Sequence, residues 1–319
     1  MKHQLTIAMY ILLLLVGTIA ADTSAFEILQ YPGAINTWPE DIRDGVIVGR
    51  YRDNSSVIHG FVYDGSTYSK LDFPGSSYTT LSGTDGTNIV GVYFNSANQQ
   101  RGFLFDGNSF TTIAPTDTST TLFNGACATG VDGQTIVGSY YNSLGKPNGF
   151  VFDGAIYSTF GFSTGGTYAP EDIEGNNIAG SCFGQGPEHG FLYDGETTLS
   201  LFYPADNTLA TRATAVSGNR VVGYYYESSS LAKHSFIYEQ GDYSMYDVPA
   251  SLGEDTEIRG IDGDKIVGYY IGTSGAYYGF VTTIPEPCTL QLLMTICLCC
   301  LMVRRPATCI LSRRCASHR

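Results

Sequence analysis

The chain has 319 residues, with 17 Lys and Arg against 30 Asp and Glu, and a formal net charge of −13 at pH 7. So acidic a chain repels nucleic acid and anionic lipid surfaces, which argues against a nucleic-acid partner. No phosphate-binding loop or dinucleotide fingerprint occurs either, so nothing indicates nucleotide-dependent chemistry.

Residues 1–21 have the pattern of a secretory signal peptide. Lys2 precedes an apolar run from Ile7 to Val16, and small residues follow, ending with Ala20 and Ala21. A charged start, an apolar stretch and a small-residue cleavage site predict export. The alternative is a permanent N-terminal anchor, but the run is shorter than the roughly 20 residues that span a bilayer.

Between the two ends, one short pattern recurs six times. Its anchor is Ile-Val-Gly-x-Tyr or a close variant, and its glycines stand 42 to 47 residues apart at Gly49, Gly91, Gly138, Gly180, Gly223 and Gly268. A period of roughly 40–50 residues in β-type sequence is typical of a propeller or a related array. We expect one all-β domain over residues 22–283.

The second repeat illustrates the strands expected in each copy. They cover Tyr78–Thr84, Ile89–Tyr93, Gly102–Phe105 and Phe110–Ala114. The Asp106-Gly107 pair predicts a hairpin turn between the last two strands, because Gly tolerates positive φ and Asp bonds its own backbone. Each repeat therefore predicts one four-stranded blade.

Two features of the sequence predict that the ring closes. The last repeat lacks an outer strand, and an extra copy of that strand precedes the first repeat. The first repeat ends in an outer strand, Tyr68–Gly75, whereas the sixth runs from Phe280 directly to Pro285. A similar segment, Phe26–Gly33, precedes the first repeat. We expect this N-terminal strand to complete the last blade beside Gly279–Val281, which removes two exposed edges. The fold expected is a six-bladed β-propeller, and the alternative is an open solenoid.

The C-terminus, residues 284–319, has the order of a second targeting signal. A turn-forming triplet precedes an apolar stretch at about 288–303, which predicts a transmembrane helix, and basic residues then favour a cytoplasmic end. The residues that define this motif are Pro285, Glu286, Pro287, Arg304 and Arg305.

This tail closely resembles the PEP-CTERM sorting signal of Gram-negative bacteria. The resemblance implies secretion machinery and an exosortase-type membrane protease as partners. It also implies transient anchoring in the inner membrane by the C-terminal helix, then release to the cell surface or extracellular matrix. Without the two ends, 11 Lys and Arg face 29 Asp and Glu, which gives a net charge near −18.

The body is similar to the HAF-type extracellular repeat family, named for a His-Ala-Phe step. Here the step reads His59-Gly60-Phe61, His189-Gly190-Phe191 and His234-Ser235-Phe236. The resemblance implies export and a repeat fold, and the family offers no established activity to carry over.

The His, Asp and Glu residues of the repeats could suggest metal or catalytic sites, but structural roles explain them better. The three histidines stand at equivalent places in separate blades, too far apart to share a metal. Single Asp-Gly pairs suit hairpin turns better than calcium loops. The pairs Glu40-Asp41 and Glu171-Asp172 resemble glycosidase carboxylates, but they too recur at matching places. We expect no catalytic residue, no metal and no cofactor.

Only Cys127 and Cys182 lie in the body. An exported compartment permits a disulfide, but the two cysteines occupy different positions in neighbouring repeats. Two buried free thiols are the favoured expectation, with a disulfide as the alternative.

The functional hypothesis is a non-enzymatic surface or matrix protein that uses the propeller as a binding or structural platform, with exopolysaccharide as a candidate ligand. The alternative is a propeller lyase or hydrolase acting on polysaccharide, which clustered acids, His and Arg in the centre would favour. No ligand-binding residue is assigned. A binding face could include the loops Arg52–Val57, Asn95–Gln100, Asn142–Pro147 and Ser228–Lys233.

Overall fold

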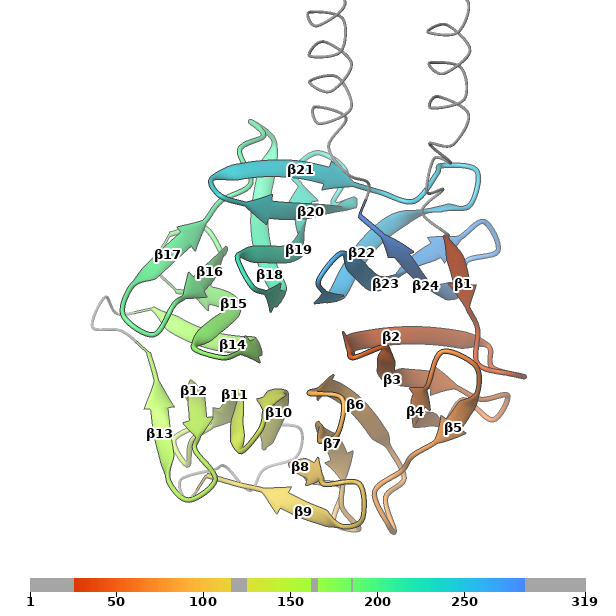
Figure 1. Ribbon diagram of the computed structural model, residues 1–319, viewed down its shortest axis with the longest axis vertical. Coiled ribbons are helices and arrows are strands. Elements are labelled where there is room, and N and C mark those ends of the chain that lie inside the picture. Colours follow the sequence, from red (N-terminus) through yellow and green to blue (C-terminus); the bar gives the residue numbers. More distant parts are fainter. Residues whose placement is uncertain (1–25, 116–124, 162–165, 185, 285–319) are drawn as a thin grey trace, which may run out of the picture. The chain divides into compact units, whose positions relative to one another are not determined.

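The computed structural model describes residues 26–115, 125–161, 166–184 and 186–284. These residues form six four-stranded antiparallel sheets arranged around a ring (Figure 1). Within the described ranges there is no helix of the length and apolarity needed to cross a membrane. The predicted six-bladed all-β propeller is confirmed, whereas the signal peptide, the sorting motif and the helix at about 288–303 lie outside the described residues.

The first three blades follow one another along the chain. Blade 1 consists of β2 (Asn36–Arg43), β3 (Val46–Arg52), β4 (Ile58–Tyr63) and β5 (Tyr68–Lys70). Blade 2 consists of β6 (Thr79–Thr84), β7 (Ile89–Phe94), β8 (Gln100–Phe105) and β9 (Phe110–Ile113). Blade 3 consists of β10 (Ala126–Asp132), β11 (Thr135–Tyr141), β12 (Pro147–Phe152) and β13 (Tyr157–Phe160).

The last three blades repeat this order, and the sixth takes its outer strand from the start of the chain. Blade 4 consists of β14 (Thr167–Glu174), β15 (Asn177–Phe183), β16 (His189–Tyr193) and β17 (Thr198–Leu201). Blade 5 consists of β18 (Thr208–Ser217), β19 (Arg220–Glu227), β20 (Lys233–Glu239) and β21 (Asp242–Tyr246). Blade 6 consists of β22 (Gly253–Asp262), β23 (Lys265–Gly272), β24 (Tyr277–Thr283) and β1 (Glu27–Leu29).

The closure of the ring is the one predicted. β1 pairs antiparallel with β24, with Leu29 opposite Gly279 and Glu27 opposite Val281. Leu29 is fully buried in a cluster with residues of blade 1, among them Ile42 and Phe61. The open-solenoid alternative is therefore wrong.

The glycine of Ile-Val-Gly has a steric cause. Each inner strand carries a β-bulge at the same place, for example between Leu81 and Gly83 of β6. A Cβ built on Gly91 would lie 2.0 Å from the carbonyl oxygen of Thr80, and the five equivalent glycines meet the same obstacle at 1.9–2.2 Å. Only a residue without a side chain allows the second strand to approach the bulged inner strand this closely.

The phenylalanine of each Gly-Phe step forms the core of its blade. All six are at most 1% exposed: Phe61, Phe103, Phe150, Phe191, Phe236 and Phe280. The Asp-Gly turns are also as predicted. Gly65 has φ +89°, and the Asp64 carboxylate accepts hydrogen bonds from the backbone N–H groups of Ser66 and Thr67, which lower the pKa of Asp64.

Two aspartates of the paired-carboxylate motifs join adjacent blades. Asp41 accepts a hydrogen bond from the N–H of Thr84 in blade 2 at 2.8 Å, and Asp172 accepts one from the N–H of Val216 in blade 5 at 2.9 Å. Both carboxylates are buried, and burial raises their pKa values, that of Asp172 to about 6. The predicted structural role, as opposed to a catalytic one, is therefore confirmed for these two aspartates.

A pH dependence of stability follows from Asp172. The folded protein keeps this proton up to pH about 6, whereas the unfolded chain loses it near the ordinary value of 3.8, so stability falls as pH rises between these values. The contribution is about 3 kcal/mol at most. We expect Asp172→Asn to flatten the slope of unfolding free energy between pH 4 and 6, measured by urea denaturation, and an unchanged slope would contradict the assignment.

Candidate functional site

Two of the three repeat histidines, His59 and His234, have the structural role that the sequence predicts. His59 pairs with Asp72 at 2.7 Å and His234 with Asp247 at 2.6 Å, each fastening a third strand to the segment that follows its own outer strand. No group of three or more His, Cys, Asp or Glu in the described part could hold a metal.

Cys127 and Cys182 are free thiols, the former half-buried and the latter buried, so the disulfide alternative is wrong.

The sequence also contains one serine motif that the predictions above do not include. Residues 161–165 read Gly-Phe-Ser-Thr-Gly, the spacing of a nucleophile elbow. That motif requires a turn from a strand into a helix. Here the flanking elements, β13 and β14, are both strands, and residues 162–165 lie outside the described ranges. The serine motif therefore adds nothing to a catalytic assignment.

One end of the ring is bridged across its centre. Arg43 of β2 in blade 1 pairs with Glu174 of β14 in blade 4, and these blades lie on opposite sides of the ring (Figure 1). Glu174 also accepts a hydrogen bond from the N–H of Gly218 in blade 5. The loops between second and third strands lie at the other end of the ring.

The repeat becomes asymmetric at the residue that follows the Ile-Val-Gly glycine. In blades 2 to 4 this residue and its cross-strand partner are small or medium-sized: Val92 with Thr80, Ser139 with Cys127, and Ser181 with Ala169. In blades 5, 6 and 1 both are large: Tyr224 with Arg212, Tyr269 with Glu257, and Arg50 with Trp38. Three consecutive blades thus carry large side chains at this position. We call these six residues the polar sector, together with Glu40, Tyr226, Lys233 and Arg259 of the same three blades and Glu188 from the adjoining loop of blade 4.

The polar sector is connected by ion pairs and hydrogen bonds. In blades 4 to 6, Arg212 pairs with Glu188, and Lys233 pairs with Glu257. Glu257 also accepts a hydrogen bond from the Tyr269 hydroxyl at 2.7 Å. Burial raises the pKa of Tyr269, so this phenol stays protonated and acts as a donor.

The network continues into blade 1 through a shared carboxylate. Glu40 pairs with Arg259 of blade 6 and with Arg50 of its own blade, both at 2.9 Å. Desolvation raises the pKa of Glu171. The nearby guanidinium groups of Arg259 and Arg212 lower it, but their effect is smaller, so the pKa is raised overall. The glutamates of the two paired-carboxylate motifs thus belong to a charged centre, in contrast to the neighbouring aspartates.

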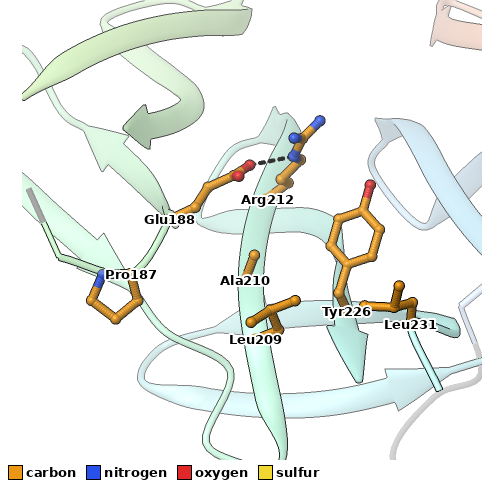
Figure 2. A pocket seen from close by; sticks show the side chains of 7 residues that line it. All are labelled: Pro187, Glu188, Leu209, Ala210, Arg212, Tyr226 and Leu231. Atoms are coloured by element: carbon orange, nitrogen blue, oxygen red, sulfur yellow. Dashed lines mark hydrogen bonds and ion pairs between the residues drawn. The ribbon is translucent and has the colours of Figure 1, made fainter. Parts of the chain in front are cut away.

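A pocket of about 490 Å³ opens at the edge of the polar sector, between blades 4 and 5 (Figure 2). Its lining combines the Glu188–Arg212 ion pair and the ring of Tyr226 with apolar side chains, of which Leu209 is 52% and Leu231 61% exposed. The remaining lining residues are Pro187 and Ala210. Hydrogen-bonding groups on one wall and apolar surface on the other suit a small polar ligand with an apolar face.

The pocket takes one residue from the loops that the sequence singled out. The loop Ser228–Lys233 contributes Leu231 to the pocket, but Glu188 comes from the corresponding loop of blade 4, which was not singled out. Arg212 and Tyr226 lie on strands and were missed altogether. The signal that could have found the polar sector is the variable position of Ile-Val-Gly-x-Tyr, which changes from small to large after the fourth repeat.

Comparisons with known proteins support the fold class alone. No protein-family model matches the chain, and no curated protein matches it. Among solved structures it is similar to a putative TolB from Agrobacterium tumefaciens, with 13% identity, a TM-score of 0.52, and coverage of 81% of this chain and 92% of the other.

Two further similarities are weaker. A fucose-specific lectin from Aleuria aurantia has a TM-score of 0.41 and 18% identity, over 71% of this chain and 80% of the lectin. Trypanosoma rangeli sialidase has a TM-score of 0.49 and 12% identity, over 87% of this chain and 62% of the sialidase. The class that the structure defines is a six-bladed β-propeller, with a pocket of mixed polar and apolar lining between two blades.

Proposed function

We propose that the protein is an exported, non-catalytic glycan-binding propeller and that the pocket between blades 4 and 5 is its binding site. The observation that carries this proposal is the composition of that pocket, which joins an ion pair, a phenol ring and exposed leucines within about 490 Å³. The volume accommodates a sugar unit rather than a folded partner.

The ion pair supplies directional contacts for sugar hydroxyls. The Arg212 guanidinium offers N–H donors, and the Glu188 carboxylate offers acceptors, so neighbouring hydroxyl groups can bind both at once. Because the two side chains already hold each other, little side-chain entropy is lost when a ligand binds. The pair is therefore preorganised for polar recognition.

The opposite wall supplies apolar contact. Leu209 and Leu231 are more than half exposed and line the same pocket, so together they give it an apolar surface that a ligand can cover. The Tyr226 side chain adds apolar ring atoms to this surface and a hydroxyl for hydrogen bonding. Together the two walls match the amphipathic surface of a carbohydrate.

The site of action is part of the same proposal. The N-terminal and C-terminal signals predicted from residues 1–21 and 284–319 support delivery to the cell surface or extracellular matrix, with an exosortase-type protease as the processing partner. A net charge near −18 in the body is compatible with an extracellular setting. A polysaccharide matrix would then be the natural source of ligand.

Binding can be tested with a panel of immobilised polysaccharides and a matched pair of variants. We expect retention of the purified protein on at least one polymer, and about tenfold weaker binding for Tyr226→Ala. Tyr141 occupies the same register in blade 3 and does not line the pocket, so Tyr141→Ala is the control and should bind normally. Equal affinity of the two variants would remove the pocket from the proposal.

The charged centre favours one second candidate, a polysaccharide hydrolase or lyase. Glu171 is a half-buried carboxyl whose pKa is raised by desolvation although two arginines lie near it, and a raised pKa is a property of general acids. Release of oligosaccharide during incubation with the same panel, abolished in Glu171→Gln, would support this function. Retention of intact polymer with no product would support binding alone.

A further inference from the structure

We infer that the pocket between blades 4 and 5 selects glycans that carry a carboxylate, as uronic acids do, with Arg212 as the recognising group. This inference rests on the glycan binding proposed above and names its ligand class.

Arg212 keeps one edge of its guanidinium available. Its Nε donates to Glu188, and one terminal nitrogen lies 3.4 Å from the hydroxyl of Tyr224, a long contact. In Figure 2 the terminal nitrogens point away from Glu188. A guanidinium bound through Nε still presents two parallel N–H groups, the arrangement that a planar carboxylate accepts in a bidentate manner.

Two aromatic rings hold this guanidinium in position. Its central carbon lies 5.7 Å from the ring centre of Phe183 and 5.8 Å from that of Tyr226. Lys233 adds a second cation, with its Nζ 5.7 Å from the ring centre of Tyr226. Two positive groups therefore lie over the ring that borders the pocket, which places an anion-attracting wall beside the apolar one.

In each ion pair of the polar sector, the exposed fractions of the two side chains show which charge faces solvent and hence a ligand. In the Lys233–Glu257 pair the lysine side chain is 27% exposed and the carboxylate 4%, and in the Arg50–Glu40 pair the values are 31% and 5%. Arg212 is also more exposed than Glu188, at 36% against 23%. The cations thus cover their carboxylates, and the polar sector presents positive charge on a body that is otherwise strongly acidic.

The direct test changes the ligand and leaves the protein intact. Binding of a soluble polyuronate is measured by calorimetry beside the same polymer after chemical reduction of its carboxyl groups to alcohols. We expect reduction to weaken binding at least about tenfold, the effect of losing charge-assisted hydrogen bonds. Equal affinity for the two polymers would overturn the inference and leave glycan binding standing, whereas binding to no glycan of any kind would refute the proposed function itself.

A matched pair of variants assigns the effect to Arg212. Arg212→Lys retains the positive charge and a partner for Glu188 but loses the two-pronged geometry. We expect it to lower polyuronate affinity about tenfold and to lower affinity for the reduced polymer by a clearly smaller factor, because the hydroxyl contacts of Arg212 are common to both polymers. Arg220→Lys, a partly exposed arginine of β19 that pairs with Glu239 and Asp264, is the control. Stronger binding to a sulfated glycan than to the polyuronate would contradict carboxylate selection.

Discussion

Replacement of Leu29 by Ala is expected to lower the free energy of unfolding by about 2–5 kcal/mol, the range for truncation of a buried leucine. The reason is its place in the closure of the ring. Leu29 is fully buried between blades 6 and 1, in a cluster that includes Ile42, Phe61 and Val267. The loss also weakens the three-residue pairing of β1 with β24, the contact that joins the two ends of the propeller.

The neighbouring residue provides a control within the same strand. Ile28 pairs with Phe280 through the backbone, but its side chain is 47% exposed. Ile28→Ala should therefore change the unfolding free energy by no more than about 1 kcal/mol. Urea denaturation followed by tyrosine fluorescence measures both variants, and similar losses for the two would mean that Leu29 has no special part in closure.

Replacement of Gly91 by Ala is expected to destabilise the protein by about 3 kcal/mol, at the upper end of the range for overpacking. The added Cβ would lie 2.0 Å from the carbonyl oxygen of Thr80 and 3.0 Å from the ring of Phe103. The obstacle is backbone on one side and a fully buried ring on the other, so neither can move at low cost.

A second glycine separates this steric effect from the general effect of replacing glycine. A Cβ on Gly161 would meet nothing within 4 Å, and this residue has no positive φ. Gly161→Ala should thus be neutral or stabilising by up to about 1 kcal/mol, because alanine has fewer unfolded conformations. Thermal denaturation compares the two variants, and a small effect at Gly91 would contradict the close approach of the first two strands of blade 2.

Much of the fold could be predicted because each blade uses the same local rules. The second repeat illustrates this, since its observed strands Thr79–Thr84 and Ile89–Phe94 differ by one residue at most from those expected. Ring closure could also be predicted, because a spare strand pattern at Phe26–Gly33 and a missing one after Phe280 are both visible in the sequence. Alternation, turns and periodicity are local signals.

The charged contacts at the centre of the ring could not be predicted because they join residues far apart in the chain. Arg259 and Glu40 are 219 residues apart, and Arg43 and Glu174 are 131 apart. Which side chains meet at the centre depends on the ring's closure and on the register of each inner strand after its bulge. The pair Glu171-Asp172 shows how far the sequence can predict such roles. Asp172 joins two blades as expected, whereas the neighbouring Glu171 belongs to the charged centre, which was not expected.

The crystal structure of a complex with a bound oligosaccharide tests the proposed function most directly. The account predicts a sugar unit between blades 4 and 5, packed on Leu209 and Tyr226, with its polar groups bonded to Arg212. A sugar bound elsewhere, for instance beside Glu171 at the centre of the ring with this pocket empty, would contradict it.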